Sequence, residues 1–188
     1  METTFYGLPL FHEPGRVFTP RRTTELLVAE TLELDPRRVA DVGTGSGAIA
    51  VAIAAHAPKA DVWATDVCAE AVRAARANVA RHRLGARVHV LQADLLHGVP
   101  GELDLVVANL PYLPDSEHLP EYDDEPAAAV YAPGDGLAHY RRLLAAAESL
   151  LRPDGRLAIQ YRGRVLEAGH AELSALRQRL ECPAWVAS

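Results

Sequence analysis

The stretch with the clearest chemical meaning is Asn109-Leu110-Pro111-Tyr112, which follows an apolar run that begins at Asp104. Pro111 cannot donate a backbone hydrogen bond to a sheet and keeps Leu110 extended, so a strand is expected to end here. An amide side chain, the Leu110 carbonyl and an aromatic ring would then stand at the carboxyl edge of a sheet, where open α/β folds bind ligands. The two oxygens can accept the N–H bonds of a planar amino or amide group, and the Tyr112 ring can stack on its plane.

A glycine segment, Gly43-Thr44-Gly45-Ser46-Gly47, is the second chemical signal. It stands between an expected buried strand and an Ala-rich helix, where glycines permit positive φ and a close approach of the backbone to a ligand. Asp66 ends the next expected strand, where its carboxylate can accept both hydroxyls of a ribose. These features alone also satisfy a relaxed dinucleotide fingerprint, so an NAD-dependent dehydrogenase is an alternative for this segment.

Two further acids favour a different cofactor. Asp41 lies two positions before Gly43, where its carboxylate can order the loop and face a cationic or amine-bearing ligand. Asp94 ends the third expected strand at the same edge, placed to accept from an adenine amino group. S-adenosylmethionine carries an amine, a ribose and an adenine but no phosphate. Three acids therefore suit it, whereas they would repel a pyrophosphate.

These motifs resemble those of a known family. The segment from Asp41 to Gly47 resembles motif I of the class I S-adenosylmethionine-dependent methyltransferases. Asn109-Leu110-Pro111-Tyr112 resembles their (Asn/Asp)-Pro-Pro-Tyr motif, found in enzymes that methylate adenine, cytosine or the glutamine side-chain amide. Segments 8–11, 18–25 and 125–155 are similar to the flanking sequences of the HemK/PrmC glutamine-N5 methyltransferases.

The resemblance implies a Rossmann-like fold, S-adenosylmethionine as cofactor and a protein glutamine side chain as the methyl acceptor. It implies a cofactor site made of Asp41, Gly43, Thr44, Gly45, Gly47, Asp66, Val67, Asp94, Leu95 and Asn109. It also implies catalytic roles for Asn109, Leu110, Pro111 and Tyr112, and acceptor-side roles for Phe18, Arg21 and Glu125. No metal ligands are expected, because the histidines and cysteines show no metal-type spacing.

The sequence departs from the family pattern at three places. Leu110 replaces the first proline of the usual motif, as in the ribosomal-RNA adenine dimethyltransferases, but it keeps the backbone carbonyl. Gln160 opens a Gln-Tyr-Arg-Gly segment where the family typically has Glu-x-Gly. The N-terminal helical domain that docks the release factor in bacterial members is absent from this sequence.

These departures leave other functions open. One is a small-molecule or biosynthetic N-methyltransferase, and another is an RNA or DNA adenine-N6 methyltransferase. A third is an S-adenosylmethionine-binding module without activity. Acidic residues after Tyr112 make a nucleic-acid acceptor the less favoured of these.

The elements that would position these groups follow from residue periodicity. Residues 1–21 are expected to form an irregular arm whose aromatic side chains cover the core or a pocket. Expected helices cover 23–34, 48–57, 69–84, 137–151 and 165–180, and a turn is expected at 153–155. Expected strands cover 38–42, 61–66, 87–94, a segment from Asp104 up to the tetrapeptide, 156–161 and 184–187.

This alternation predicts an α/β domain, a three-layer α/β/α sandwich with a mostly parallel sheet. We expect a single domain over 1–188, with an N-terminal arm and helix at 1–35 and a Rossmann-like core at 36–188. The C-terminal strands are curtailed, so the exposed sheet edge would suit a dimer or another partner chain.

Composition narrows the class of protein further. The chain has 188 residues and a net charge of −6, which disfavours bulk attraction to nucleic acid or an anionic membrane. No window reaches the ~18 continuous apolar residues that a membrane span needs. The start of the sequence lacks the features of a signal peptide, so we expect a cytoplasmic protein.

Overall fold

The structure is a computed structural model that describes residues 1–180, and a six-stranded sheet lies at its centre. The strand order is β10-β9-β6-β3-β4-β5, and every neighbouring pair is parallel except β9 with β10. The strands are β3 (Arg38–Val42), β4 (Asp61–Asp66), β5 (Val88–Gln92), β6 (Leu103–Ala108), β9 (Leu151–Tyr161) and β10 (Arg164–Gly169).

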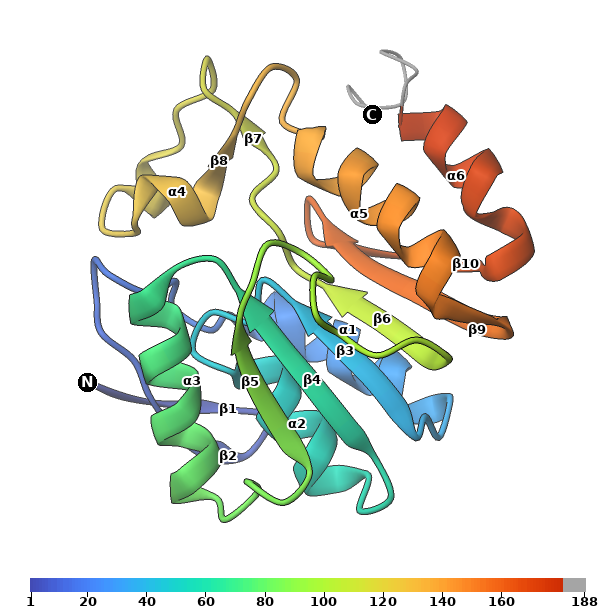
Figure 1. The fold of residues 1–188 in the computed structure, drawn as a ribbon. Helices are drawn as coiled ribbons and strands as arrows, with labels where there is room; N and C mark the ends of the chain where they lie inside the picture. Colours follow the sequence, from blue (N-terminus) through green and yellow to red (C-terminus); the bar gives the residue numbers. More distant parts are fainter. Residues whose placement is uncertain (181–188) are drawn as a thin grey trace.

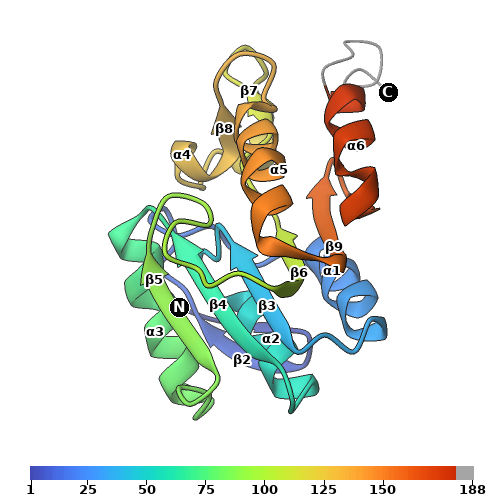
Figure 2. The same cartoon turned by 45° about the vertical axis from the view of Figure 1, so that its right-hand side comes forward.

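Helices cover both faces of this sheet (Figures 1 and 2), as expected for a three-layer sandwich. One face packs against α1 (Arg22–Glu33), α2 (Ala48–His56) and α3 (Ala69–Arg81). The other packs against α5 (Ala138–Leu150) and α6 (Leu173–Leu180). Within residues 1–180, no helix combines the length and the apolar character that crossing a membrane requires.

The central strands are mostly apolar because both of their faces are buried. In β6, Leu105 and Val107 pack into the core beneath α1 and α2, whereas Val106 and Ala108 pack into the core beneath α5. Alternate side chains of a strand point to opposite faces, so a strand covered on both sides needs apolar residues at every position. The polar Asn109 therefore marks the point where β6 leaves the core.

The N-terminal arm differs from the expectation. Residues 2–11 were expected to be irregular, but they form a hairpin of β1 (Glu2–Phe5) and β2 (Leu8–Phe11). Its two-residue turn has positive φ at both Tyr6 and Gly7 (48° and 75°), the geometry that matches the twist of paired strands. The strands are four residues long and lack the usual Asn-Gly turn signal, which is why their pattern was not visible in the sequence.

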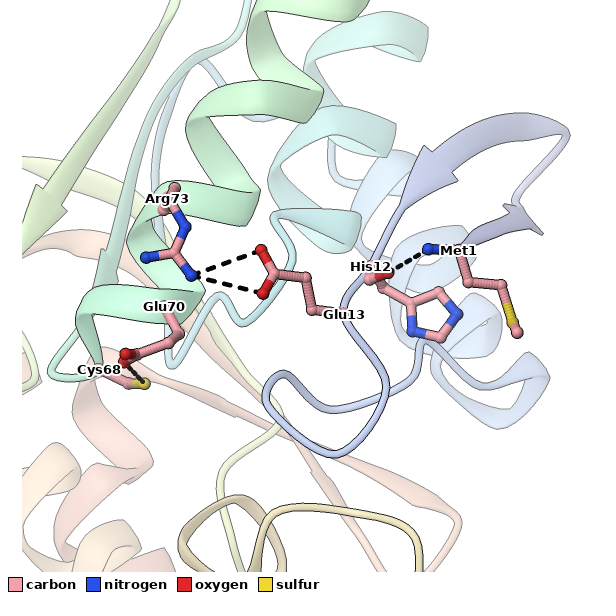
Figure 3. Close-up of polar contacts among 6 residues, drawn as sticks. All are labelled: Met1, His12, Glu13, Cys68, Glu70 and Arg73. Carbon is pink, nitrogen blue, oxygen red and sulfur yellow. Dashed lines mark hydrogen bonds and ion pairs between the residues drawn. The ribbon is translucent and has the colours of Figure 1, made fainter.

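The hairpin is anchored to the glycine segment by one buried side chain. Asn78 of α3 is fully buried, accepts the Phe11 N–H (2.7 Å) and donates to the Phe11 carbonyl (2.7 Å). The same side chain donates to the Ser46 carbonyl at 2.8 Å. Figure 3 shows a second contact between the arm and α3, an ion pair of Glu13 with Arg73 at 3.4 Å. The arm is thus part of the framework that holds the glycine segment.

The C-terminal part also corrects the prediction. The helix expected at 165–180 is wrong for its first half, because β10 pairs antiparallel with β9 and α6 begins only at Leu173. A tight turn at Arg162 and Gly163, with φ of 45° and 75°, reverses the chain. The turn expected at 153–155 lies inside β9, as a looped-out segment between the Leu103–Leu151 and Leu105–Arg156 pairings. The strand expected at 184–187 lies outside the described residues.

A segment that we call the flap, residues 115–130, projects above the carboxyl ends of the central strands (Figure 1). Its base is closed by the short parallel pairing of β7 (Leu113–Pro114) with β8 (Tyr131–Ala132). It contains a 3₁₀ turn (Pro120–Tyr122) and α4 (Ala127–Val130). Only β7 separates the flap from the tetrapeptide, so the flap forms a roof over the sheet edge where ligands bind.

Candidate active site

A cavity of about 260 Å³ opens at the carboxyl edge of the sheet, beneath the flap. It is lined by the tetrapeptide, the glycine segment, the arm and the flap. The residues predicted from the sequence that line it are Phe18, Arg21, Gly43, Thr44, Gly45, Asp66, Val67, Asp94, Leu95, Asn109, Leu110, Pro111 and Tyr112. Asp41, Gly47 and Glu125 do not line it.

The two motifs are in direct contact. Gly43 has φ of +70°, and a Cβ added there would stand 2.5 Å from the Leu110 Cδ2 atom. Leu110 is itself buried, with 6% of its surface exposed. The absence of a side chain at Gly43 therefore creates the space that the leucine of the tetrapeptide fills. Gly45, with φ of +56°, has no atom within 4 Å of an added Cβ and lines the cavity.

Gly47 has a different role. Its φ is +80°, and a Cβ added there would lie 3.1 Å from the Cα of Ala75 in α3. This glycine allows the start of α2 to pack closely against α3. Its contact with a cofactor therefore stays a prediction.

Asp41 lies under the glycine segment and is fully buried. Its Oδ2 accepts the Thr44 hydroxyl (2.6 Å) and the Ala50 N–H in the first turn of α2 (3.0 Å). Its Oδ1 has no hydrogen-bond partner within residues 1–180. Burial raises the pKa of Asp41 to about 7, and the neighbouring charge of Asp66 contributes in the same direction. These contacts match the loop-ordering role expected for Asp41, and its interaction with a ligand remains a prediction.

The other two acids line the cavity itself. Asp66 accepts the backbone N–H groups of Gly45 and Cys68, both at 2.9 Å, and burial raises the pKa of its carboxyl group. Asp94 lies two residues beyond the end of β5, where it pairs with Arg142 of α5 at 2.5 Å. The Gly45 N–H bonds to the Asp66 Oδ2 atom and the Cys68 N–H to its Oδ1 atom, and a carboxylate oxygen has lone pairs for further donors.

Asn109 is oriented by the first turn of α1. Its Nδ2 donates to the Thr24 hydroxyl at 3.2 Å, and Thr24 is buried. With the nitrogen held in this way, the Asn109 Oδ1 atom is available to a ligand in the cavity. Nothing in the sequence indicated this contact.

Tyr140 of α5 holds the tetrapeptide backbone. Its fully buried hydroxyl accepts the Leu110 N–H (3.1 Å) and lies 2.5 Å from the Gln160 carbonyl, to which it donates. The Leu110 carbonyl is farther away, at 3.2 Å. A hydroxyl has one proton, and the closer oxygen takes it, so the Leu110 carbonyl remains available to accept from a ligand. Burial raises the pKa of Tyr140, which keeps the hydroxyl protonated.

The arm and the flap clasp each other over the cavity. The rings of Phe18 and Tyr122 stack with their centroids 6.2 Å apart, and the Arg21 guanidinium lies beside both, at 5.4 Å and 4.4 Å from the centroids. It donates to the Glu121 carbonyl at 3.0 Å and pairs with Glu125 at 3.4 Å. Glu125, whose side chain is 6% exposed, also accepts the Thr19 N–H. We call these contacts the strap. Glu125 thus acts behind the cavity wall, and Tyr122 joins the site without having been predicted.

The chain belongs to a known family of methyltransferases. Residues 11–121 match the family described as the methyltransferase small domain. The release factor glutamine methyltransferase of Moorella thermoacetica is 45% identical over 152 residues, which cover 77% of this chain and 54% of that protein. The protein of the same name from Chlorobaculum tepidum is 37% identical over 177 residues, or 85% of this chain and 60% of that one.

A solved structure adds to the comparison. The ribosomal protein L11 methylase of Lactobacillus delbrueckii subsp. bulgaricus has a TM-score of 0.56 and 29% identity, covering 90% of this chain and 72% of that one. The shared fold extends over nearly the whole of this chain. The chain spans little more than half the length of the two curated relatives.

Proposed function

We propose that this chain, which belongs to the methyltransferase small domain family, is an S-adenosylmethionine-dependent methyltransferase that acts on a planar amide nitrogen. One observation carries this proposal. The Asn109 Oδ1 atom and the Leu110 carbonyl are both left available at the cavity, because Thr24 holds the Asn109 nitrogen and Tyr140 donates elsewhere. Two oxygens at adjacent residues suit the two N–H bonds of a primary amide.

The charge of the cavity supports this cofactor. Asp41 and Asp66 lie close enough for one carboxylate to raise the pKa of the other. An electronegative pocket of this kind favours a cationic ligand and disfavours a pyrophosphate. The open space at Gly45 and the unpartnered Asp41 Oδ1 fit a ligand that carries an amine and approaches the backbone closely. S-adenosylmethionine bound there would supply a methyl group on a sulfonium, which is an intrinsically good methyl donor.

The residues of the chain then orient the acceptor. An amide nitrogen is a weak nucleophile because its lone pair is delocalised into the carbonyl. Asn109 and Leu110 would fix the nitrogen by its two N–H bonds and stabilise the positive charge that develops on it. The bound cofactor would supply the methyl group and keep the sulfur as a neutral thioether, and the surplus proton of the acceptor nitrogen would leave to water. Well-oriented reactants can gain about 7–11 kcal/mol in this way, so positioning would provide most of the acceleration.

Tyr112 and the strap complete the acceptor side. Tyr112 is held by an edge-on contact with the Tyr161 ring at 5.4 Å, and burial raises its pKa, so it serves as a neutral surface for a planar group. Phe18 and Arg21 line the same cavity from the arm. We assign them to acceptor contact, with Glu125 holding Arg21 in place.

The acceptor that we favour is a glutamine side chain of a release factor, because both curated relatives carry that activity in their names. This acceptor would place the reaction in the cytoplasm. We call the Asn109 Oδ1 atom and the Leu110 carbonyl the acceptor clamp. An adenine amino group could bind to the same clamp. However, several exposed acids of the flap would repel a nucleic-acid backbone, namely Asp115, Glu121, Asp123 and Asp124.

Transfer of labelled methyl from S-adenosylmethionine to release factor, to simple carboxamides and to RNA, compared side by side, tests the proposal. We expect label on the release factor. Label on RNA alone would replace the favoured acceptor with a nucleic acid. Calorimetry with S-adenosylmethionine and with NAD tests the cofactor separately, and heat with NAD only would contradict the methyltransferase assignment.

A further inference from the structure

The first turn of α5 closes one end of the cavity. Asp94 and Leu95, on the loop after β5, line this end, and so does His139 of α5. Arg142 stands three positions after His139, and residues three apart lie on the same face of a helix. The Arg142 Nη2 atom donates to the Asp94 Oδ2 atom at 2.5 Å, so α5 and the loop are in contact. Arg142 itself does not line the cavity, and it reaches Asp94 from outside.

The strand order places the polar groups of the cavity in a row along the sheet edge. The tetrapeptide follows β6, the glycine segment follows β3, Asp66 ends β4 and Asp94 follows β5, and these four strands are neighbours in that order. In S-adenosylmethionine, the sulfur and the adenine are attached at opposite ends of the ribose. A cofactor that presents its methyl group to the tetrapeptide and its ribose to Asp66 therefore extends its adenine towards Asp94.

The two carboxylate oxygens of Asp94 differ in their contacts. Oδ2 is held by Arg142, whereas Oδ1 accepts no hydrogen bond from the part of the chain that the structure describes. The side chain of Asp94 is 58% exposed, so without Arg142 the carboxylate could rotate into solvent. Arg142 thus restricts the orientation of Asp94 and leaves one oxygen to accept from a ligand.

We propose that Arg142 is a positioning residue, which orients Asp94 to accept the amino group of the cofactor's adenine. This inference rests on the proposed function, because it concerns the same cofactor. The adenine amino group is neutral, and Arg142 is 55% exposed, so the positive charge of Arg142 itself has little effect on the ligand. What the ion pair provides is order, because a side chain that is fixed before binding loses less conformational entropy when the ligand binds.

The test is calorimetric titration with S-adenosylhomocysteine, which measures cofactor affinity without the reaction. For Arg142→Gln we expect Kd to rise about threefold, the effect of ordering one more side chain on binding. Arg142 makes a single contact with Asp94, so Arg142→Lys should restore most of the affinity. Arg156→Gln is the matched control, since it breaks an exposed ion pair with Glu167 and neither of these residues lines the cavity. Both glutamine variants should unfold close to the wild-type Tm.

A double-mutant cycle shows whether Arg142 acts through Asp94. In the Asp94→Ala background, Arg142→Gln should leave the Kd for S-adenosylhomocysteine unchanged, because the side chain that it orients is gone. Salt screens an exposed ion pair, so a rise from about 0.1 M to 1 M should weaken binding more in the wild type than in Arg142→Gln.

Two results would overturn the inference. One is a Kd for Arg142→Gln that equals that of the Arg156→Gln control. The other is an equal effect of Arg142→Gln with and without the Asp94 side chain, which would make its role structural. If the wild-type protein binds no S-adenosylhomocysteine, the proposed function fails instead.

Discussion

Replacement of Tyr140 by Phe tests how the tetrapeptide is held. The change keeps the ring and its packing but deletes the hydroxyl that accepts the Leu110 N–H and donates to the Gln160 carbonyl. Tyr140 is fully buried and Leu110 nearly so, so water cannot replace the lost partner without a rearrangement. The backbone of the acceptor clamp should loosen as a result.

The expected magnitude follows from the two backbone groups that lose their partner. A buried N–H left unpaired costs about 1–3 kcal/mol, and the loss of the second hydrogen bond adds about 1 kcal/mol. The free energy of unfolding should therefore fall by about 2–4 kcal/mol. For a chain of this length, that loss corresponds to a drop in Tm of roughly 5–15 °C. A displacement of the clamp by about 1 Å would lower kcat by up to about 100-fold.

Thermal unfolding followed by circular dichroism gives the stability change, and methyl transfer well below the Tm of the variant gives the activity change. Tyr131→Phe is the control, since it makes the same chemical change at a half-buried residue of β8 and should cost less than about 0.5 kcal/mol. A Tyr140→Phe variant that unfolds at the same temperature as this control would refute the role of the hydroxyl. Unchanged turnover would refute the link between Tyr140 and the clamp.

Three further predictions concern the framework of the site. Asn78→Ala removes the buried hydrogen bonds between the arm and the glycine segment, so urea unfolding should show a loss of about 3 kcal/mol and cofactor affinity should fall. Gly136→Ala should be more destabilising than Gly134→Ala by over about 2 kcal/mol in the same assay, because both glycines have positive φ but only at Gly136 would the Cβ meet the Tyr112 carbonyl, at 2.1 Å. The pKa of Asp41 is raised in the folded protein, from 3.8 to about 7, so the folded state binds more protons between these values. Stability of the ligand-free protein should therefore fall as the pH rises from about 4 to 7, by up to a few kcal/mol, and should level off above pH 7. Asp41→Asn should flatten this dependence, and an equally steep slope in the variant would assign the effect to another group.

The sequence contained the site's local elements because each depends on residues close together in the chain. Gly43, Gly45 and Gly47 adopt the positive φ that their spacing predicted, and β6 ends at Ala108, directly before the tetrapeptide that contains Pro111. The parallel sheet also followed from local periodicity, since its buried strands are rich in apolar residues and alternate with helical segments. These features made the fold and the location of the cavity predictable.

The residues that hold the site together could not be found in the same way. Asn109 meets Thr24 across 85 positions of sequence, and Arg21 meets Glu125 across 104. Such contacts depend on how α1 and the flap are placed over the sheet, and no local pattern encodes that placement. The sequence indicated the role of Tyr140 only weakly. A buried tyrosine needs a hydrogen-bond partner for its hydroxyl, but the sequence did not show that this partner is the tetrapeptide backbone.

The two errors of secondary structure have a common physical cause. β1, β2 and β10 have four to six residues each and are joined by tight turns without an Asn-Gly pair. In β10, Arg164 and Glu167 interrupt the alternation of apolar and polar residues that is typical of a strand. The segment was therefore predicted to be the first part of the helix that follows it. Edge strands of this kind are defined by the strand beside them more than by their own residues.

The most direct test of the central claim is methyl transfer by Asn109→Ala, measured together with the affinity for S-adenosylmethionine. If Asn109 binds the acceptor nitrogen, turnover should fall at least about 100-fold, while cofactor affinity should change by less than about threefold. An Asn109→Ala variant that methylates release factor at the wild-type rate would contradict the account.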